Sequence, residues 1–171
     1  MRKVALASAI VALVLGLVGV VAVAAASQAA QPSTPTSTTL TFDVVFSPFT
    51  PVAANNVRDP NSPFALGDEI VFHDQLFAGG KRVGDDLGSC VIVSPAPELL
   101  NSCTMVIRLT GGDITAQFAT SPGPAPKPLA LTGGTGTYRN VGGEGTLVEF
   151  GNDKGTLTLH LLSFAPRGKG A

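Results

Sequence analysis

Two aspartates, Asp43 and Asp74, are the residues of this sequence best suited to acid–base chemistry. Side chains alternate along a strand, so Ile70, Phe72, Asp74 and Leu76 share one face of their segment. A carboxylate among apolar side chains is costly unless it is hydrogen-bonded or its pKa is raised. Asp74 is therefore predicted to belong either to a structural hydrogen-bond network or to a catalytic site, with Ile70 and Phe72 as its ligand-binding neighbours.

Asp43 lies in the middle of the first predicted strand, residues 40–46. Thr41 and Val45 share its face, and the opposite face is apolar. On an open sheet the face of Asp43 would point to water, whereas a closed barrel allows it to point inward. We therefore weigh a catalytic and a structural role for Asp43 equally, and Thr41 and Val45 are ligand-binding candidates for the inward case.

Short segments of alternating apolar and polar residues fill the chain after residue 40, and none has helical periodicity. Turns rich in Gly and Pro separate them, and a long Pro-rich loop at residues 47–64 is placed to fold over one end. Eight antiparallel strands without a covering helix form either a sandwich or a barrel. We favour an all-β, eight-stranded barrel, because closure removes the edge strands and leaves room for one small ligand.

The first 29 residues have the features of an export signal. Arg2 and Lys3 precede a long apolar run, and small residues at Ser27 and Ala29 predict cleavage after Ala29. A Pro/Ser/Thr-rich linker (30–39), the barrel domain (40–164) and a flexible tail (165–171) would follow. The apolar run is also long enough to stay as a membrane anchor. A secreted protein is expected, with membrane contact only through an uncleaved signal.

Charge and motif content exclude several function classes. Removing residues 1–29 changes the formal net charge from −1 to −3, and no basic stripe is present, so nucleic acid is not an expected partner. His73 and His160 lie on different strands without metal-ligand spacing, and no GxSxG motif occurs. Neither a metal nor a cofactor is predicted, and a zinc enzyme or serine hydrolase is improbable.

A glycine-rich turn at residues 133–136 precedes Tyr138 and Arg139. Phosphate binding would require a Lys-Ser/Thr ending and a following helix, and the sequence has neither, so no nucleotide site is predicted. The side chains of Tyr138 and Arg139 either bend back to cap the domain or contact a ligand.

The two cysteines, Cys90 and Cys103, flank a turn-rich segment. Antiparallel pairing of residues 90–94 with 99–103 would bring them face to face, and exported proteins oxidise such pairs. A disulfide is therefore predicted, and a reactive thiol at Cys90 is the alternative.

Three stretches resemble, in order and spacing, the allene oxide cyclase and dirigent superfamily. They are LGDEIVFHDQLFAGGKRVGDDLGSCVIV, GGDITAQ and LALTGGTGTYRNVGGEGTL, and the resemblance covers about residues 40–161. It implies an eight-stranded antiparallel barrel, a homotrimer as in plant members, and an apolar cavity in which a reactive hydrophobic molecule is cyclised or coupled. No cofactor is implied.

The resemblance also implies roles for individual residues. Asp43 stands where the family has an acidic residue that steers or protonates the bound intermediate, and Asp74 where it has an Asn or Asp that fixes a water or a substrate oxygen. Cys90 matches a cavity cysteine of the cyclases. Val45 and Thr120 replace a polar Asn and a Tyr, so true allene oxide cyclase activity is not expected.

Three functions follow from these observations. The first is a secreted barrel isomerase, cyclase or stereo-directing protein acting on a hydrophobic small molecule. The second is a non-catalytic, lipocalin-like binding module, and the third is a structural barrel filled by its own side chains. A homotrimer is also expected, because Leu40, Phe42, Val44 and Phe46 form an apolar face that needs a cover.

Overall fold

The computed structural model describes residues 36–54, 64–95 and 97–163, so the predicted export signal and the tail lie outside the described part. No helix of the described residues is long and apolar enough to cross a membrane. These residues form nine strands and one 3-10 helix: β1 (Thr36–Val45), β2 (Thr50–Val52), β3 (Glu69–Ala78), β4 (Lys81–Ser94), β5 (Leu100–Leu109), β6 (Gly112–Thr120), β7 (Lys127–Gly134), η1 (Gly136–Tyr138), β8 (Val141–Gly151) and β9 (Lys154–Ser163).

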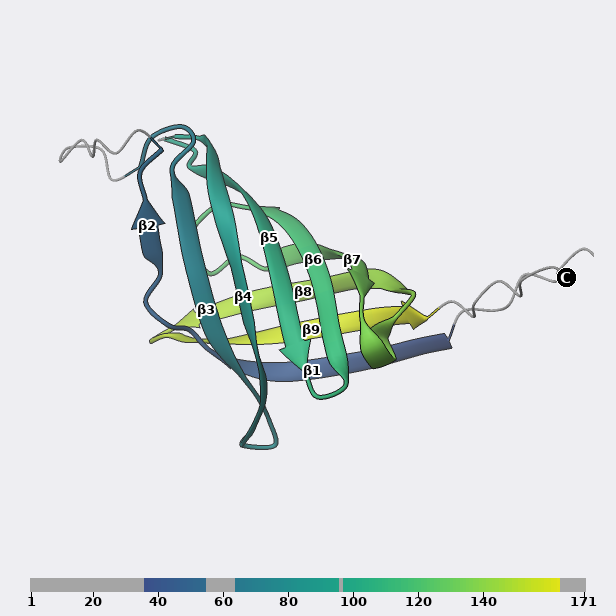
Figure 1. Ribbon diagram of the computed structural model, residues 1–171. Coiled ribbons are helices and arrows are strands. Elements are labelled where there is room, and N and C mark those ends of the chain that lie inside the picture. Colours follow the sequence, from purple (N-terminus) through teal and green to yellow (C-terminus); the bar gives the residue numbers. More distant parts are fainter. Residues whose placement is uncertain (1–35, 55–63, 96, 164–171) are drawn as a thin grey trace, which may run out of the picture. The chain divides into compact units, whose positions relative to one another are not determined.

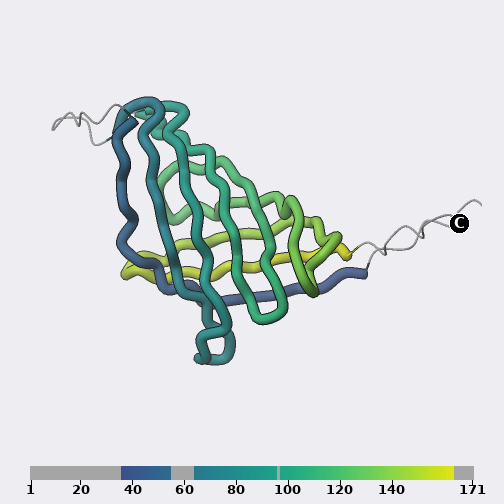
Figure 2. Tube along the Cα trace, viewed as in Figure 1, coloured from purple at the N-terminus to yellow at the C-terminus, as the bar shows by residue number. Residues whose placement is uncertain are grey.

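Eight of these strands form a closed antiparallel barrel, as predicted (Figure 1). The order runs β1-β9-β8-β7-β6-β5-β4-β3, and β3 pairs back onto β1, where Val44 lies opposite Leu76. Figure 2 shows this closure as the purple chain of β1 meeting the lower part of the hairpin formed by β3 and β4. The short β2 continues along the same edge of β3, so the loop predicted at residues 47–64 contains a strand.

The first strand begins earlier than the sequence indicated. Residues 36–39, which we expected to belong to a linker, pair with the end of β9, from Thr36 opposite Ser163 to Thr39 opposite His160. The side chains of Thr39 and His160 also share a hydrogen bond of 3.1 Å. The prediction that residues 36–39 are linker is therefore wrong, because β9 supplies them with a ladder partner.

The apolar face of β1 points into the barrel. Phe42 and Val44 are buried in the core, and Leu40 and Phe46 pack against it. The argument that this face needs a homotrimer to cover it is therefore wrong, because the barrel interior covers it.

The hairpin of β3 and β4 has a two-glycine turn and a bulge. Gly79 and Gly80 have φ values of 56° and 75°, the left-handed conformation that a tight two-residue hairpin turn requires. The register then shifts, so that Val83 is an extra residue between the paired residues Arg82 and Gly84. One extra residue turns the rest of a strand over, which decides what β4 presents to the interior.

The predicted disulfide is confirmed. Cys90 on β4 lies directly opposite Cys103 on β5, with a Cα–Cα separation of 4.0 Å and an S–S bond of 2.02 Å. The bond links two wall strands, and both cysteines are buried. Cys90 is therefore not a free thiol.

Candidate functional site

A cavity of about 1050 Å³ occupies the part of the barrel interior that the core leaves open. Met105 and Leu147 belong both to its lining and to the core, so the core forms its floor. Its mouth is formed by three connections, at residues 46–49, 121–124 and 151–154. Six of the nine phenylalanines of the chain line it: Phe46, Phe49, Phe64, Phe72, Phe118 and Phe150. The wall is thus mainly apolar and aromatic, which suits a hydrophobic small molecule.

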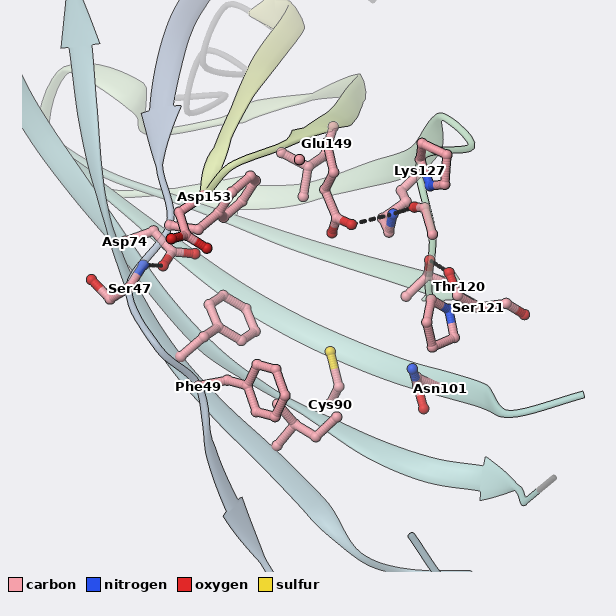
Figure 3. A pocket seen from close by; sticks show the side chains of 18 of the residues that line it. Ser47, Phe49, Asp74, Cys90, Asn101, Thr120, Ser121, Lys127, Glu149 and Asp153 are labelled. Atoms are coloured by element: carbon pink, nitrogen blue, oxygen red, sulfur yellow. Dashed lines mark hydrogen bonds and ion pairs between the residues drawn. The ribbon is translucent and has the colours of Figure 1, made fainter. Parts of the chain in front are cut away.

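Two carboxylates face each other on one wall of this cavity. Asp74 on β3 is paired directly with Asp86 on β4, and both line the cavity although they are only 5% and 3% exposed. The backbone N–H of Ser47 donates a 2.7 Å hydrogen bond to Oδ1 of Asp74 (Figure 3). Oδ1 of Asp86 is buried without a hydrogen-bond partner. The deeper of the two carboxylates is thus free to bond to a ligand.

Burial changes the proton affinity of both groups. It raises the pKa of Asp74 above the ordinary carboxyl value, an effect that the Ser47 N–H and His73 oppose. Burial, and then the negative charges of Asp74 and Asp85, raise the pKa of Asp86 to about 7. Two facing carboxylates cannot both ionise easily, so the pair tends to hold one proton near neutral pH. Such a pair contains an acid and a base in one site.

The neighbouring Asp85 has the opposite environment. It points to the outer face of β4, where Arg108 donates to its two oxygens from Nε (2.6 Å) and Nη2 (2.8 Å). His73 and Arg82 lie 3.4 Å from Oδ2. The Arg108 hydrogen bonds hold the pKa of Asp85 below its ordinary value. Adjacent aspartates are thus divided into an outer ion-paired carboxylate and an inner one that favours its protonated form.

An ion pair between a buried lysine and a half-buried glutamate lies on another part of the wall. Nζ of Lys127, at the start of β7, is 3.2 Å from Oε2 of Glu149 on β8 and donates to the carbonyl oxygen of Gly123 at 2.6 Å. Figure 3 shows this pair across the view from Asp74. Lys127 is 5% exposed, and these two partners compensate the burial of its ammonium group.

Asn101 on β5 is another polar residue of the cavity lining. It is 4% exposed, and its Oδ1 is buried without a hydrogen-bond partner. Buried polar atoms of native proteins are nearly always bonded. Its amide oxygen, like Oδ1 of Asp86, is therefore a candidate to receive a hydrogen bond from bound water or a ligand.

The structure places four of the predicted site residues in the cavity: Asp74, Ile70, Phe72 and Cys90. Asp43 lies on the exposed outer face of β1, together with Thr41 and Val45, because the apolar side chains between them take the interior. The expectation that Asp43 and Asp74 share one site is therefore wrong.

Tyr138 and Arg139 lie at the barrel end away from Asn101. The N–H of Thr137 donates to the carbonyl oxygen of Gly111, so η1 packs on the turn between β5 and β6. Tyr138 packs against the core, and Arg139 is exposed. Neither lines the cavity, and this position agrees with the capping alternative.

Sequence reasoning missed several polar residues of the cavity, among them Asp86, Asn101, Lys127 and Glu149. The Asp85–Asp86 pair was the available signal, since alternation forces one of two adjacent strand residues inward. Lys127 follows a proline-rich stretch at residues 121–126, a composition typical of a loop, yet β7 begins at this residue. Among the described residues, no group of three or more His, Cys, Asp and Glu side chains could hold a metal ion.

Comparison with known proteins identifies the family. No protein-family model matches the chain, and no curated protein matches it. A solved structure described as a pyocyanin demethylase aligns with a TM-score of 0.64 and 32% sequence identity, over 72% of this chain and 99% of its own. This chain therefore belongs to the allene oxide cyclase/dirigent-like barrel family.

More distant structures share the fold of this family member. A pterocarpan synthase dirigent protein aligns with a TM-score of 0.58 and 22% identity, over 81% of this chain and 99% of its own. An exo-specific intermolecular Diels-Alderase aligns with a TM-score of 0.54 and 16% identity, over 75% and 99% of the two chains. At these identities the likeness concerns the barrel alone.

Proposed function

We propose that this barrel binds a hydrophobic small molecule in its cavity and catalyses a proton transfer on it, as an isomerase, a cyclase or a stereo-directing protein. The observation that carries the proposal is the pair formed by Asp74 and Asp86 in an otherwise apolar, aromatic cavity. Its structural neighbours are described as a demethylase, a dirigent protein and a Diels-Alderase, and these descriptions support small-molecule chemistry in such a barrel.

In this proposal the two carboxylates have different roles. Asp86, whose pKa is about 7, keeps its proton near neutral pH and donates it to the substrate. Asp74, oriented by the Ser47 N–H, orients the substrate or accepts a proton from it. The aromatic wall excludes water and sets the conformation of the bound molecule. These steps need no group beyond the chain and its substrate.

Mass spectrometry of the purified protein would identify a co-purified ligand, and turnover of that compound would then be measured. Asp86→Asn and Asp74→Asn should each lower turnover at saturating substrate by about 100-fold or more, without a fall in melting temperature. Asp43→Asn is the matched control, because it makes the same change on the exposed outer face. Equal activity of the Asp86 and Asp43 variants would exclude the acid role.

A non-catalytic binding module is the second candidate. The cavity volume of about 1050 Å³ is at the upper end of the range typical of ligand pockets, which favours a binding function even without chemistry. Tight binding of the co-purified compound, recovered unchanged after long incubation with the protein, would establish this alternative.

We also infer that the protein is secreted, since a disulfide forms and persists in oxidising compartments. Anchoring through the N-terminal apolar segment is the alternative, and fractionation of the producing cells distinguishes the two. The homotrimer implied by the family resemblance stays a prediction, which light scattering of the purified protein tests.

A further inference from the structure

The unsatisfied polar atoms of the cavity are all of one kind. Oδ1 of Asp86 and Oδ1 of Asn101 are the buried side-chain atoms without a hydrogen-bond partner in the described part of the chain, and both residues line the cavity. Oδ1 of Asn101 accepts hydrogen bonds, and Asp74 and Asp86, which share about one proton near neutral pH, keep more acceptor than donor capacity. A molecule that completes this site must therefore bring donors.

Charge leads to the same conclusion. Among the described residues, no Lys, Arg or His side chain forms an ion pair with Asp74 or Asp86. The buried cation of the lining, Lys127, is already bound to Glu149 and to a backbone carbonyl oxygen. The wall that carries Asp74 and Asp86 therefore offers negative charge without a countercharge from the protein.

Aromatic rings lie close to this acidic wall. Phe72 is two residues from Asp74 on β3 and faces Gly88, which is two residues from Asp86 on β4. The ring of Phe72 covers Gly88, since a Cβ there would lie 2.8 Å from its Cζ. Faces of aromatic rings attract cations, most strongly where water is excluded. Carboxylates and rings together form a site for a cation attached to an apolar body.

We propose that the cavity selects hydrophobic cations, such as a protonated arylalkylamine or a positively charged nitrogen heterocycle, over neutral or anionic molecules of the same size. This inference rests on the proposed function, because it names the ligand class of that same cavity. The cationic nitrogen lies against Asp74 and Asp86, and the apolar body packs on the phenylalanines. An anionic ligand would meet carboxylates and unsatisfied acceptors on this wall, and Lys154, the other lysine of the lining, lies exposed at the mouth.

Four naphthalene probes of nearly equal size test the proposal: 2-naphthylmethylamine, 2-naphthylmethanol, 2-naphthoic acid and 2-methylnaphthalene. Titration calorimetry at pH 7.5 should show the amine binding about tenfold or more tighter than the alcohol, because a charge-assisted hydrogen bond replaces a neutral one. The acid should bind weakest. The double variant Asp74→Asn/Asp86→Asn should lower the affinity for the amine to that for the alcohol and leave the affinity for 2-methylnaphthalene unchanged, because either single variant keeps one carboxylate on this wall.

Asp43→Asn again serves as the control and should keep the preference for the amine. The single variants Asp74→Asn and Asp86→Asn should each weaken the preference, and they test the proposal should the double variant fail to fold. Binding of the alcohol or the acid as tightly as the amine would overturn the inference while leaving the proposed function intact. An amine preference that survives in the double variant, or that keeps its wild-type strength in both single variants, would overturn it as well. Failure of all four probes to bind would count against both proposals.

Discussion

Replacing Asp86 by asparagine should remove much of the pH dependence of the stability of this barrel. The carboxyl has an ordinary pKa of 3.8 and a pKa of about 7 in the fold, where burial and two neighbouring carboxylates disfavour its charge. Below pH 3.8 the group is protonated in both the folded and the unfolded chain, so it does not affect stability. As pH rises from 3.8 to about 7, the unfolded chain ionises first and stability falls.

The size of the effect follows from the two pKa values. At 1.36 kcal/mol for each pKa unit, the loss is complete above about pH 7 and amounts to about 4 kcal/mol. Asparagine has nearly the same shape and no charge to bury. Asp86→Asn should therefore match wild type near pH 4 and be more stable than wild type above pH 8.

Urea unfolding at pH 4, 6, 8 and 9 measures this difference, since the comparison of variant and wild type cancels the titrating groups that do not interact with Asp86. Asp43→Asn, on the exposed face of β1, should follow the wild-type profile throughout. Parallel profiles for Asp86→Asn and wild type would refute the reasoning, because they would mean that Asp86 has the same pKa in the folded and unfolded chain.

Two further predictions concern the barrel wall. Replacing Cys90 and Cys103 by serine should lower the unfolding free energy by about 3 kcal/mol, because the unfolded chain gains the conformational entropy that the disulfide removes by closing a loop of this length. An unchanged urea midpoint would contradict this prediction. Glu149→Gln should destabilise more than Lys127→Met, because the first leaves a buried ammonium without its carboxylate whereas the second leaves a carboxylate that is 38% exposed. Melting temperatures of Glu149→Gln, Lys127→Met and the variant that carries both substitutions show which change destabilises the protein more.

Much of this architecture could be predicted from local sequence. Alternation of side chains identified the strands, and the lack of a helix to cover an open sheet favoured closure. The disulfide was predicted from two cysteines in a chain expected to be exported, and the bond between Cys90 and Cys103 confirms it. The same alternation placed Asp74 on a face with Ile70 and Phe72, which the cavity lining contains.

Local sequence predicts that a strand exists more easily than it predicts which face of that strand points inward. A catalytic and a structural role for Asp43 were weighed equally, because its side chain would face water on an open sheet but could point inward in a barrel. In the structure the face with Phe42 and Val44 points inward, since burying these two side chains is more favourable in free energy than burying Thr41 and Val45 would be. Lys127 and Glu149 come together because β7 and β8 pair on the barrel wall.

Asp86 shows most clearly what the sequence alone determined and what it did not. Adjacent aspartates on a strand must point to opposite faces, so the sequence determined that one of Asp85 and Asp86 would turn inward. A regular hairpin built on the Gly79–Gly80 turn would have placed Asp85 opposite Asp74. The extra residue Val83 shifts the register by one and puts Asp86 there instead. Only the tertiary structure decides that bulge, because the ion pair that it places on the outer face joins Asp85 to Arg108 on β5, a strand that the local sequence of the hairpin does not contain.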